Sequence, residues 1–172
     1  MMQNHGRQLN LSHEYQLVFI EAQRGTHVFE IKYGAAYRNA SSAAPVDVDT
    51  SNRLRLMSST MNGFDKAKVL FETPLTPGVF HNFTVTIDWE RATPMAYCSQ
   101  GNAPLELVVP TTSNAVGRPG AEFHVGIVKL PVGPPNSVVF DGFQERGIHE
   151  SLVYGRVFVE DSTAGVVALP PF

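Results

Sequence analysis

The 172-residue sequence predicts an all-β fold, specifically an antiparallel β-sandwich or β-jelly roll. Short segments in which apolar and polar residues alternate recur along the chain. Clusters of Gly, Pro and Asn separate these segments, and no segment shows an apolar helical stripe with capping residues. Packing two sheets face to face is the usual way to bury such apolar rows. Neither the length nor the spacing of the turns suggests a second domain, so residues 1–172 are expected to form a single domain.

The strongest pattern predicts a β-hairpin over Leu9–Gly34, with its turn at residues 23–26. Apolar and polar residues alternate in both of its strands, and the two apolar rows are expected to share the buried face. This sets the expected register, in which the facing pairs are Tyr15 with Tyr33, Leu17 with Ile31, and Phe19 with Phe29. The opposite face then carries Glu14, Gln16, Glu30 and Lys32.

The rest of the chain is expected to add short strands joined by loops. Strands are predicted at residues 53–57, 68–72, 78–90, 95–99, 105–109, 121–130, 138–143 and 151–160. Residues 35–51 and 111–120 are predicted loops. The clearest alternation lies in 78–90, where the buried row is predicted to be Phe83, Val85, Ile87 and Trp89.

Composition excludes several classes of protein. The chain is 43% hydrophobic and 17% charged, as a globular domain is. Its net charge of −3 and the absence of a Lys/Arg run give no reason to expect a nucleic-acid partner. No apolar run is long enough to span a membrane, and residues 1–8 lack the apolar core of a signal peptide. The single cysteine, Cys98, excludes an internal disulfide.

Common catalytic and nucleotide-binding motifs are absent from the sequence, including GxSxG, HExxH, the P-loop, GxGxxG and CxxC. The histidines are spread along the chain without the spacing of a ligand set. We therefore expect no metal and no cofactor.

Glu14 is the candidate acid or base, although a solvated carboxylate on the outer face is the simpler interpretation of its spacing. Glycoside hydrolysis needs two carboxyl groups roughly 5–9.5 Å apart. In the predicted register Glu14 faces Gly34. Glu30 lies four residues from Gly34, which is roughly 13 Å along the strand. Glu30 is therefore expected to be too distant to be its partner.

Two further side chains are candidates for ligand contact. His124 shares a strand face with Gly126, and a glycine in a strand can mark the close approach of a ligand or of another backbone. The residues leave open whether His124 lines a cleft or packs. Gln144 follows a predicted strand end, where it either reaches a cleft rim or belongs to a polar turn.

Several separated blocks of this sequence resemble glycoside hydrolase family 131. In the order of that family they are Leu9–Gln16 (LNLSHEYQ), Gly78–Phe83, Phe123–Gly126 followed by Lys129 and Pro131, Gly142–Glu145, and Leu152–Gly155. The resemblance implies a β-jelly roll with an open cleft, as in secreted fungal β-glucanases. It also implies activity on β-1,3-, β-1,6- and β-1,4-linked glucans.

By the same resemblance, one catalytic glutamate carries over to Glu14, and Gln16, His124 and Gln144 bind substrate. The second glutamate of the family lies in an upstream block like Arg-Arg-x-Glu-Leu, which this sequence lacks. The chain thus resembles about the C-terminal two-thirds of the catalytic domain, a jelly roll incomplete at its N-terminus. We expect such a chain to hydrolyse glucan poorly or not at all on its own.

Three functions are therefore weighed. The first is hydrolysis of β-glucan by a monomer that is secreted, as the resemblance implies. The alternative is a non-catalytic β-glucan-binding or degenerate jelly-roll protein. The third is a polysaccharide lyase, whose unsaturated product would absorb in the ultraviolet.

Overall fold

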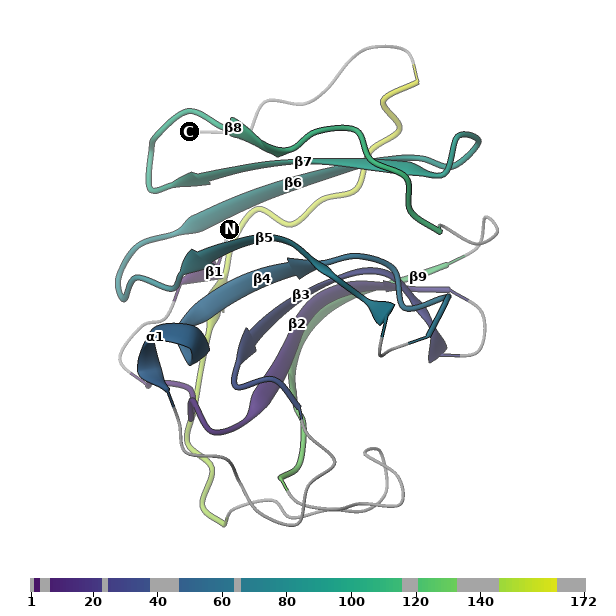
Figure 1. Ribbon diagram of the computed structural model, residues 1–172. Coiled ribbons are helices and arrows are strands. Elements are labelled where there is room, and N and C mark those ends of the chain that lie inside the picture. The colour runs from purple at the N-terminus through teal and green to yellow at the C-terminus, as the bar shows by residue number, and fades with distance from the viewer. Residues whose placement is uncertain are drawn as a thin grey trace.

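The computed structural model describes residues 2–3, 7–22, 25–37, 47–63, 66–115, 121–132 and 146–163. Within these residues the chain forms short strands and one helical turn, which confirms the predicted all-β sandwich (Figure 1). The elements are β1 (Met2–Gln3), β2 (Glu14–Glu21), β3 (His27–Gly34), α1 (Val48–Ser51), β4 (Arg53–Met57), β5 (Val69–Pro74), β6 (His81–Asp88), β7 (Thr93–Gln100), β8 (Glu106–Val109), β9 (Glu122–Lys129) and β10 (Val153–Tyr154). Among the described residues, no helix is long and apolar enough to cross a membrane.

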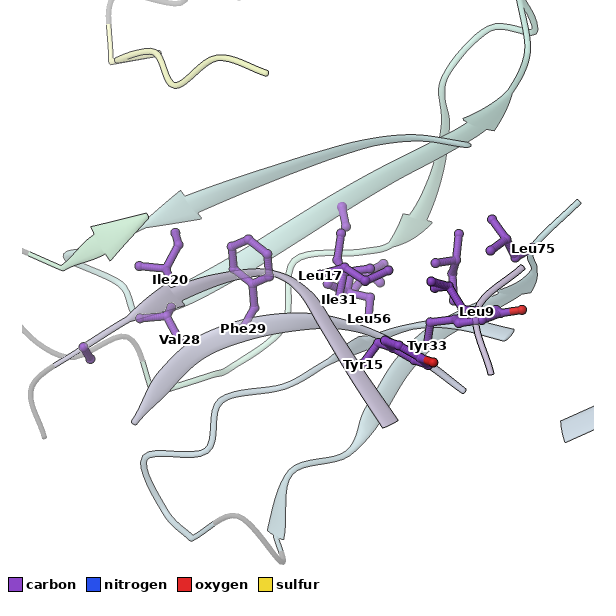
Figure 2. Packing of buried hydrophobic residues seen from close by; sticks show 14 residues of the cluster. Leu9, Tyr15, Leu17, Ile20, Val28, Phe29, Ile31, Tyr33, Leu56 and Leu75 are labelled. Carbon is purple, nitrogen blue, oxygen red and sulfur yellow. The ribbon is translucent and has the colours of Figure 1, made fainter. Parts of the chain in front are cut away.

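The strands pair into two sheets of five strands each. Sheet A has the order β10-β1-β6-β7-β8, and sheet B has the order β5-β4-β3-β2-β9. Figure 1 shows them as two stacked layers. The main hydrophobic cluster draws on both sheets, and its members from sheet A are Ala96 and Val109. Leu17 and Ile31 are among its members from sheet B (Figure 2). The other face of sheet B, which we call the outer face, is therefore turned away from the core.

The β2–β3 hairpin has the predicted start but not the predicted register throughout. Tyr15 faces Tyr33 as expected, and then irregularities occur between Gln16 and Val18 and between Phe19 and Glu21. Between them the facing pairs are Val18 with Ile31 and Phe19 with Glu30. The predicted pairs Leu17–Ile31 and Phe19–Phe29 are wrong, because a bulge inserts one residue into one strand and shifts the pairing.

The shift changes the face on which Phe19 lies. A one-residue slip turns a side chain to the other side of a sheet. Phe19 leaves the predicted core row and stacks against His27 and His124, with ring centroids 4.4 and 4.5 Å apart. The outer face of sheet B thus gains a histidine–phenylalanine–histidine stack that simple alternation does not predict.

The remaining elements follow the sequence pattern with three exceptions. β4 has the predicted bounds, and Phe83, Val85, Ile87 and Trp89 pack against the core as predicted. Of the predicted strand 151–160, only Val153–Tyr154 pairs with another described strand. Arg156 has a positive φ of 54° that interrupts the extended backbone. Residues 48–51 form α1 within a predicted loop, and β1, which was not predicted, pairs with β10 and β6. The predicted strand 138–143 lies outside the described residues.

Candidate functional site

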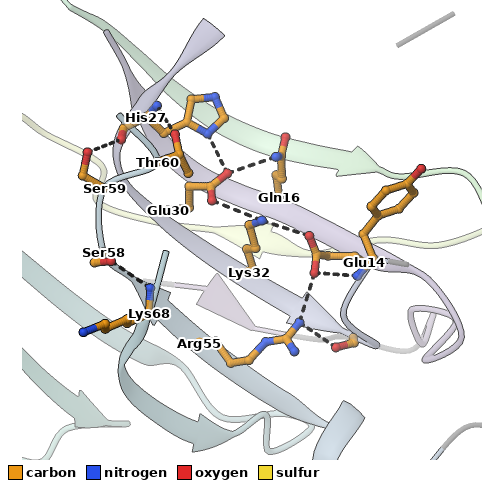
Figure 3. Close-up of polar contacts among 12 residues, drawn as sticks. Glu14, Gln16, His27, Glu30, Lys32, Arg55, Ser58, Ser59, Thr60 and Lys68 are labelled. Carbon is orange, nitrogen blue, oxygen red and sulfur yellow. Dashed lines mark hydrogen bonds and ion pairs between the residues drawn. The ribbon is translucent and has the colours of Figure 1, made fainter. Parts of the chain in front are cut away.

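A group of polar side chains covers the outer face of the β2–β3 hairpin and the neighbouring strand β4 (Figure 3). We call this group the hairpin network; its members are Glu14, Gln16, His27, Glu30, Lys32 and Arg55. Alternation along the two hairpin strands predicts four of the six. Arg55 was missed, although it alternates with Leu54 and Leu56 and faces Lys32 in the next strand. That alternation is the signal that could have found it.

Glu14 is almost buried, with 7% of its surface exposed, and both of its carboxylate oxygens have partners. Oε1 accepts a hydrogen bond from Lys32 Nζ at 2.9 Å. Oε2 accepts one from the backbone N–H of Tyr37 at 2.9 Å and lies 3.6 Å from Arg55 Nη2. Arg55 is itself fixed by a 2.8 Å hydrogen bond from Nη2 to the Gly34 carbonyl oxygen. The interpretation of Glu14 as a solvated surface carboxylate is therefore wrong.

Glu30 is fully buried and has three polar neighbours. Its Oε1 lies 2.6 Å from His27 Nδ1 and accepts a 3.0 Å hydrogen bond from Gln16 Nε2, while Oε2 lies 3.1 Å from Lys32 Nζ. Burial alone would raise the pKa of Glu30, but His27 and Lys32 together lower it below 4.5. The carboxylate is therefore ionised at neutral pH, and His27 donates its Nδ1 proton to it.

Lys32 connects the two carboxylates. Its Nζ contacts Glu14 Oε1 and Glu30 Oε2 at 2.9 and 3.1 Å, so these oxygens lie no more than about 6 Å apart. Burial would lower the pKa of Lys32, but the two carboxylates raise it, and the ammonium stays charged. The expectation that Glu30 is too distant is wrong for the side chains, because long side chains on one face lean along the strand.

This separation does not by itself make a catalytic pair. The distance is compatible with the roughly 5–9.5 Å between glycosidase carboxyl groups. Glu30, however, has no exposed surface, and the carboxylates contact Lys32, Arg55 and His27. Within the described residues, Glu30 holds Lys32 and His27 in place, and Glu14 is the carboxylate with some access to solvent.

Three of the four predicted site residues lie on this same face. Gln16 belongs to the hairpin network through Glu30. His124, on β9, faces Phe19 in the register, and Phe19 also stacks on His27, which contacts Glu30. Side-chain contacts thus run from Glu14 at one end of the face to His124 at the other. Gln144 lies outside the described residues.

The fold and site together define a β-sandwich protein whose outer sheet face presents carboxylate, amide and imidazole groups. Residues 1–165 match the family model described as the glycoside hydrolase 131 catalytic N-terminal domain, and the chain belongs to this family. The match confirms the resemblance found in the sequence. No protein with curated annotation matches the chain.

Two solved structures share the fold. One is a GH131 β-glucanase catalytic domain from Podospora anserina, with a TM-score of 0.60 and 22% identity over 88% of this chain. The other is the catalytic domain of a glycoside hydrolase family 131 protein from Coprinopsis cinerea, with a TM-score of 0.56 and 20% identity over 76% of this chain. The chain spans 50% and 46% of these two domains, respectively.

Proposed function

We propose that the protein acts on β-glucan as a glycoside hydrolase in which Glu14 is the catalytic carboxylate. The observation that carries this proposal is the position of Glu14, between Lys32 and Arg55 on the outer face of sheet B in a chain of family 131. Two cations and a backbone N–H hold the carboxylate in one orientation, as acid–base or nucleophilic catalysis requires. The Podospora anserina relative named as a β-glucanase supports β-glucan as the substrate class.

Gln16 and His124 would bind the glucan along the same face, with Gln144 as a third predicted contact. We propose β-1,3-, β-1,6- and β-1,4-linked glucans as substrates, for a secreted, monomeric protein that forms a single domain. Hydrolysis also needs a second carboxyl group. Because Glu30 is fully buried, we propose that these 172 residues on their own cleave glucan slowly or not at all.

The alternative function is β-glucan binding without cleavage. One observation favours it: Glu14 and Glu30 are both ion-paired with Lys32, and only Glu14 retains any exposed surface. A face of this kind could hold sugar hydroxyl groups through its amide and imidazole side chains without supplying a proton to a glycosidic oxygen.

The test uses the purified chain with laminarin, pustulan and cello-oligosaccharides, which present the three linkages. New reducing ends report hydrolysis, ultraviolet absorbance reports a lyase, and affinity electrophoresis reports binding. The key variant is Glu14→Gln, and the matched control is Glu106→Gln, at an exposed position on β8 of sheet A. Loss of hydrolysis in the first variant alone supports the proposal. Hydrolysis that survives Glu14→Gln rejects it. If the unaltered chain binds glucan but gives no product even on prolonged incubation, these residues on their own have the alternative function.

A further inference from the structure

A second cluster of polar groups lies where β2 and β9 pair, at the other end of the outer face. Glu21 faces Glu122 directly, and Phe19 faces His124 two pairs further along. His124 Nε2 lies 3.4 Å from Glu21 Oε2 and 3.6 Å from Glu122 Oε2. One ligand atom from each of the three residues falls within 4.8 Å of the others. We propose that Glu21, Glu122 and His124 bind a divalent transition-metal ion of the Zn²⁺ type.

The charges of the cluster favour a cation. Like charges directly opposite each other on paired strands are destabilising, and Glu21 and Glu122 form such a pair. The ion pairs described for these two carboxylates both run to His124, which is cationic only when it is protonated. A divalent ion between the carboxylates would replace their repulsion with attraction and leave the imidazole neutral, as a metal ligand must be.

The imidazole provides a second and independent observation. His124 Nε2 has under 1 Å² of exposed surface, although the side chain as a whole is 36% exposed. Its contacts with the described residues are the ion-pair distances to Glu21 and Glu122, and neither has the geometry of a hydrogen bond. A buried polar atom that makes no hydrogen bond is uncommon in folded proteins. The ring is held in this orientation by stacking on Phe19, at 4.5 Å and 13°, and Phe19 stacks in turn on His27. Nε2 thus points toward the two carboxylates in the absence of an ion.

The distances and donor types indicate the class of metal. Zn²⁺ binds nitrogen and oxygen ligands at about 2.1 Å in tetrahedral geometry, which places neighbouring ligand atoms about 3.4 Å apart. Both histidine–carboxylate separations are close to that value. The side chains of Glu21 and Glu122 are 34% and 80% exposed, so they can rotate to close the third edge. Ca²⁺ and Mg²⁺ prefer all-oxygen sites, and the imidazole therefore selects against them.

Sequence spacing could not reveal this site. Glu21 is about one hundred residues from Glu122 and His124 in the chain, and only the β2–β9 register brings the three together. The expectation of no metal rested on the spacing of the histidines. That spacing cannot reveal a ligand set made of one histidine and two glutamates. The proposed site does not include Glu14 and does not rest on the proposed hydrolase function, but it shares His124 with the proposed glucan-binding face.

The test measures metal binding to the full chain after dialysis against a chelator. Isothermal titration with ZnCl₂ should show one site per chain, and Co²⁺ should give visible absorption bands of a nitrogen- and oxygen-ligated ion. Titration with CaCl₂ or MgCl₂ should give much weaker binding. A chain that binds no Zn²⁺, or that binds Ca²⁺ as tightly as Zn²⁺, would overturn the proposal.

Variants locate the bound ion. His124→Gln and Glu122→Gln should each weaken Zn²⁺ binding by about tenfold or more, a loss that even a hydrogen-bond partner of a ligand can produce. Glu122 is exposed, so that variant should fold normally. The matched controls are His149→Gln and Glu106→Gln, at exposed positions outside the cluster, and both should bind Zn²⁺ like the unaltered chain. Equal affinity in the ligand variants and the controls would refute the site, whatever the chain does to glucan.

Discussion

Removing the charge of Lys32 should destabilise the protein, because the ammonium now compensates the repulsion between the carboxylates of Glu14 and Glu30. In Lys32→Met the carboxylate oxygens of Glu14 and Glu30 remain no more than about 6 Å apart without the ammonium between them. At an effective dielectric constant of about 20, two unit charges at that distance repel by about 3 kcal/mol. Breaking a buried ion pair from one side typically costs about 3–5 kcal/mol, which agrees. We expect the free energy of unfolding to fall by about 3 kcal/mol or more.

Urea unfolding at neutral pH measures this loss, and Lys68→Met is the matched control. Lys68 is exposed, and its substitution should change the free energy of unfolding by less than about 0.5 kcal/mol. The double variant Lys32→Met/Glu30→Gln should be more stable than Lys32→Met alone, because it removes one of the two repelling charges. A Lys32→Met protein as stable as the Lys68→Met control would refute the bridging role of Lys32. A double variant no more stable than Lys32→Met would refute the repulsion.

Three other predictions concern two buried groups and the glycine at the end of β3. Burial lowers the pKa of His81 below 6.5, so the unfolded chain takes up a proton first, and stability should decrease as the pH falls from about 6.5. His81→Gln should flatten that slope in pH-dependent thermal unfolding, and an unchanged slope would contradict the assignment. Burial raises the pKa of Cys98 to about 11. The thiol of the native protein should therefore react with a disulfide reagent far more slowly than the thiol of the unfolded protein, and equal rates would disprove this. Gly34 has a φ of 86°, and a Cβ there would meet the His13 carbonyl. Gly34→Ala should therefore lower the free energy of unfolding by more than about 1 kcal/mol in urea unfolding. Gly126→Ala, where a Cβ meets open space, should lower it by less.

The sequence was a good guide to strands and a poor guide to registers. Alternation placed β4 at its observed bounds and identified the buried row of β6, because one apolar face against a core produces a period of two. Bulges leave no such signature. The irregularities on either side of Val18 and Phe19 moved one aromatic side chain from the expected core row to the outer face.

The end of the predicted strand at 151–160 failed for a related reason. Val157, Phe158 and Val159 have the apolar character of a strand, yet they are 54%, 50% and 65% exposed and pair with no described strand. A strand needs a partner for its backbone groups as well as a suitable composition. Arg156, with its positive φ, ends the extended run two residues after the last residue of the short β10.

The site shows what an argument from backbone spacing leaves out. Alternation correctly predicted that four polar side chains share one face: Glu14, Gln16, Glu30 and Lys32. The distance along the backbone, however, led us to expect no interaction between Glu30 and Glu14. The long Lys32 side chain makes them one electrostatic unit. Glu14→Gln therefore removes a candidate catalytic group and also changes the charge balance around Lys32. Loss of activity in that variant can be assigned to catalysis only if Glu30→Gln, which alters the same balance from a fully buried position, leaves the rate of glucan cleavage less affected.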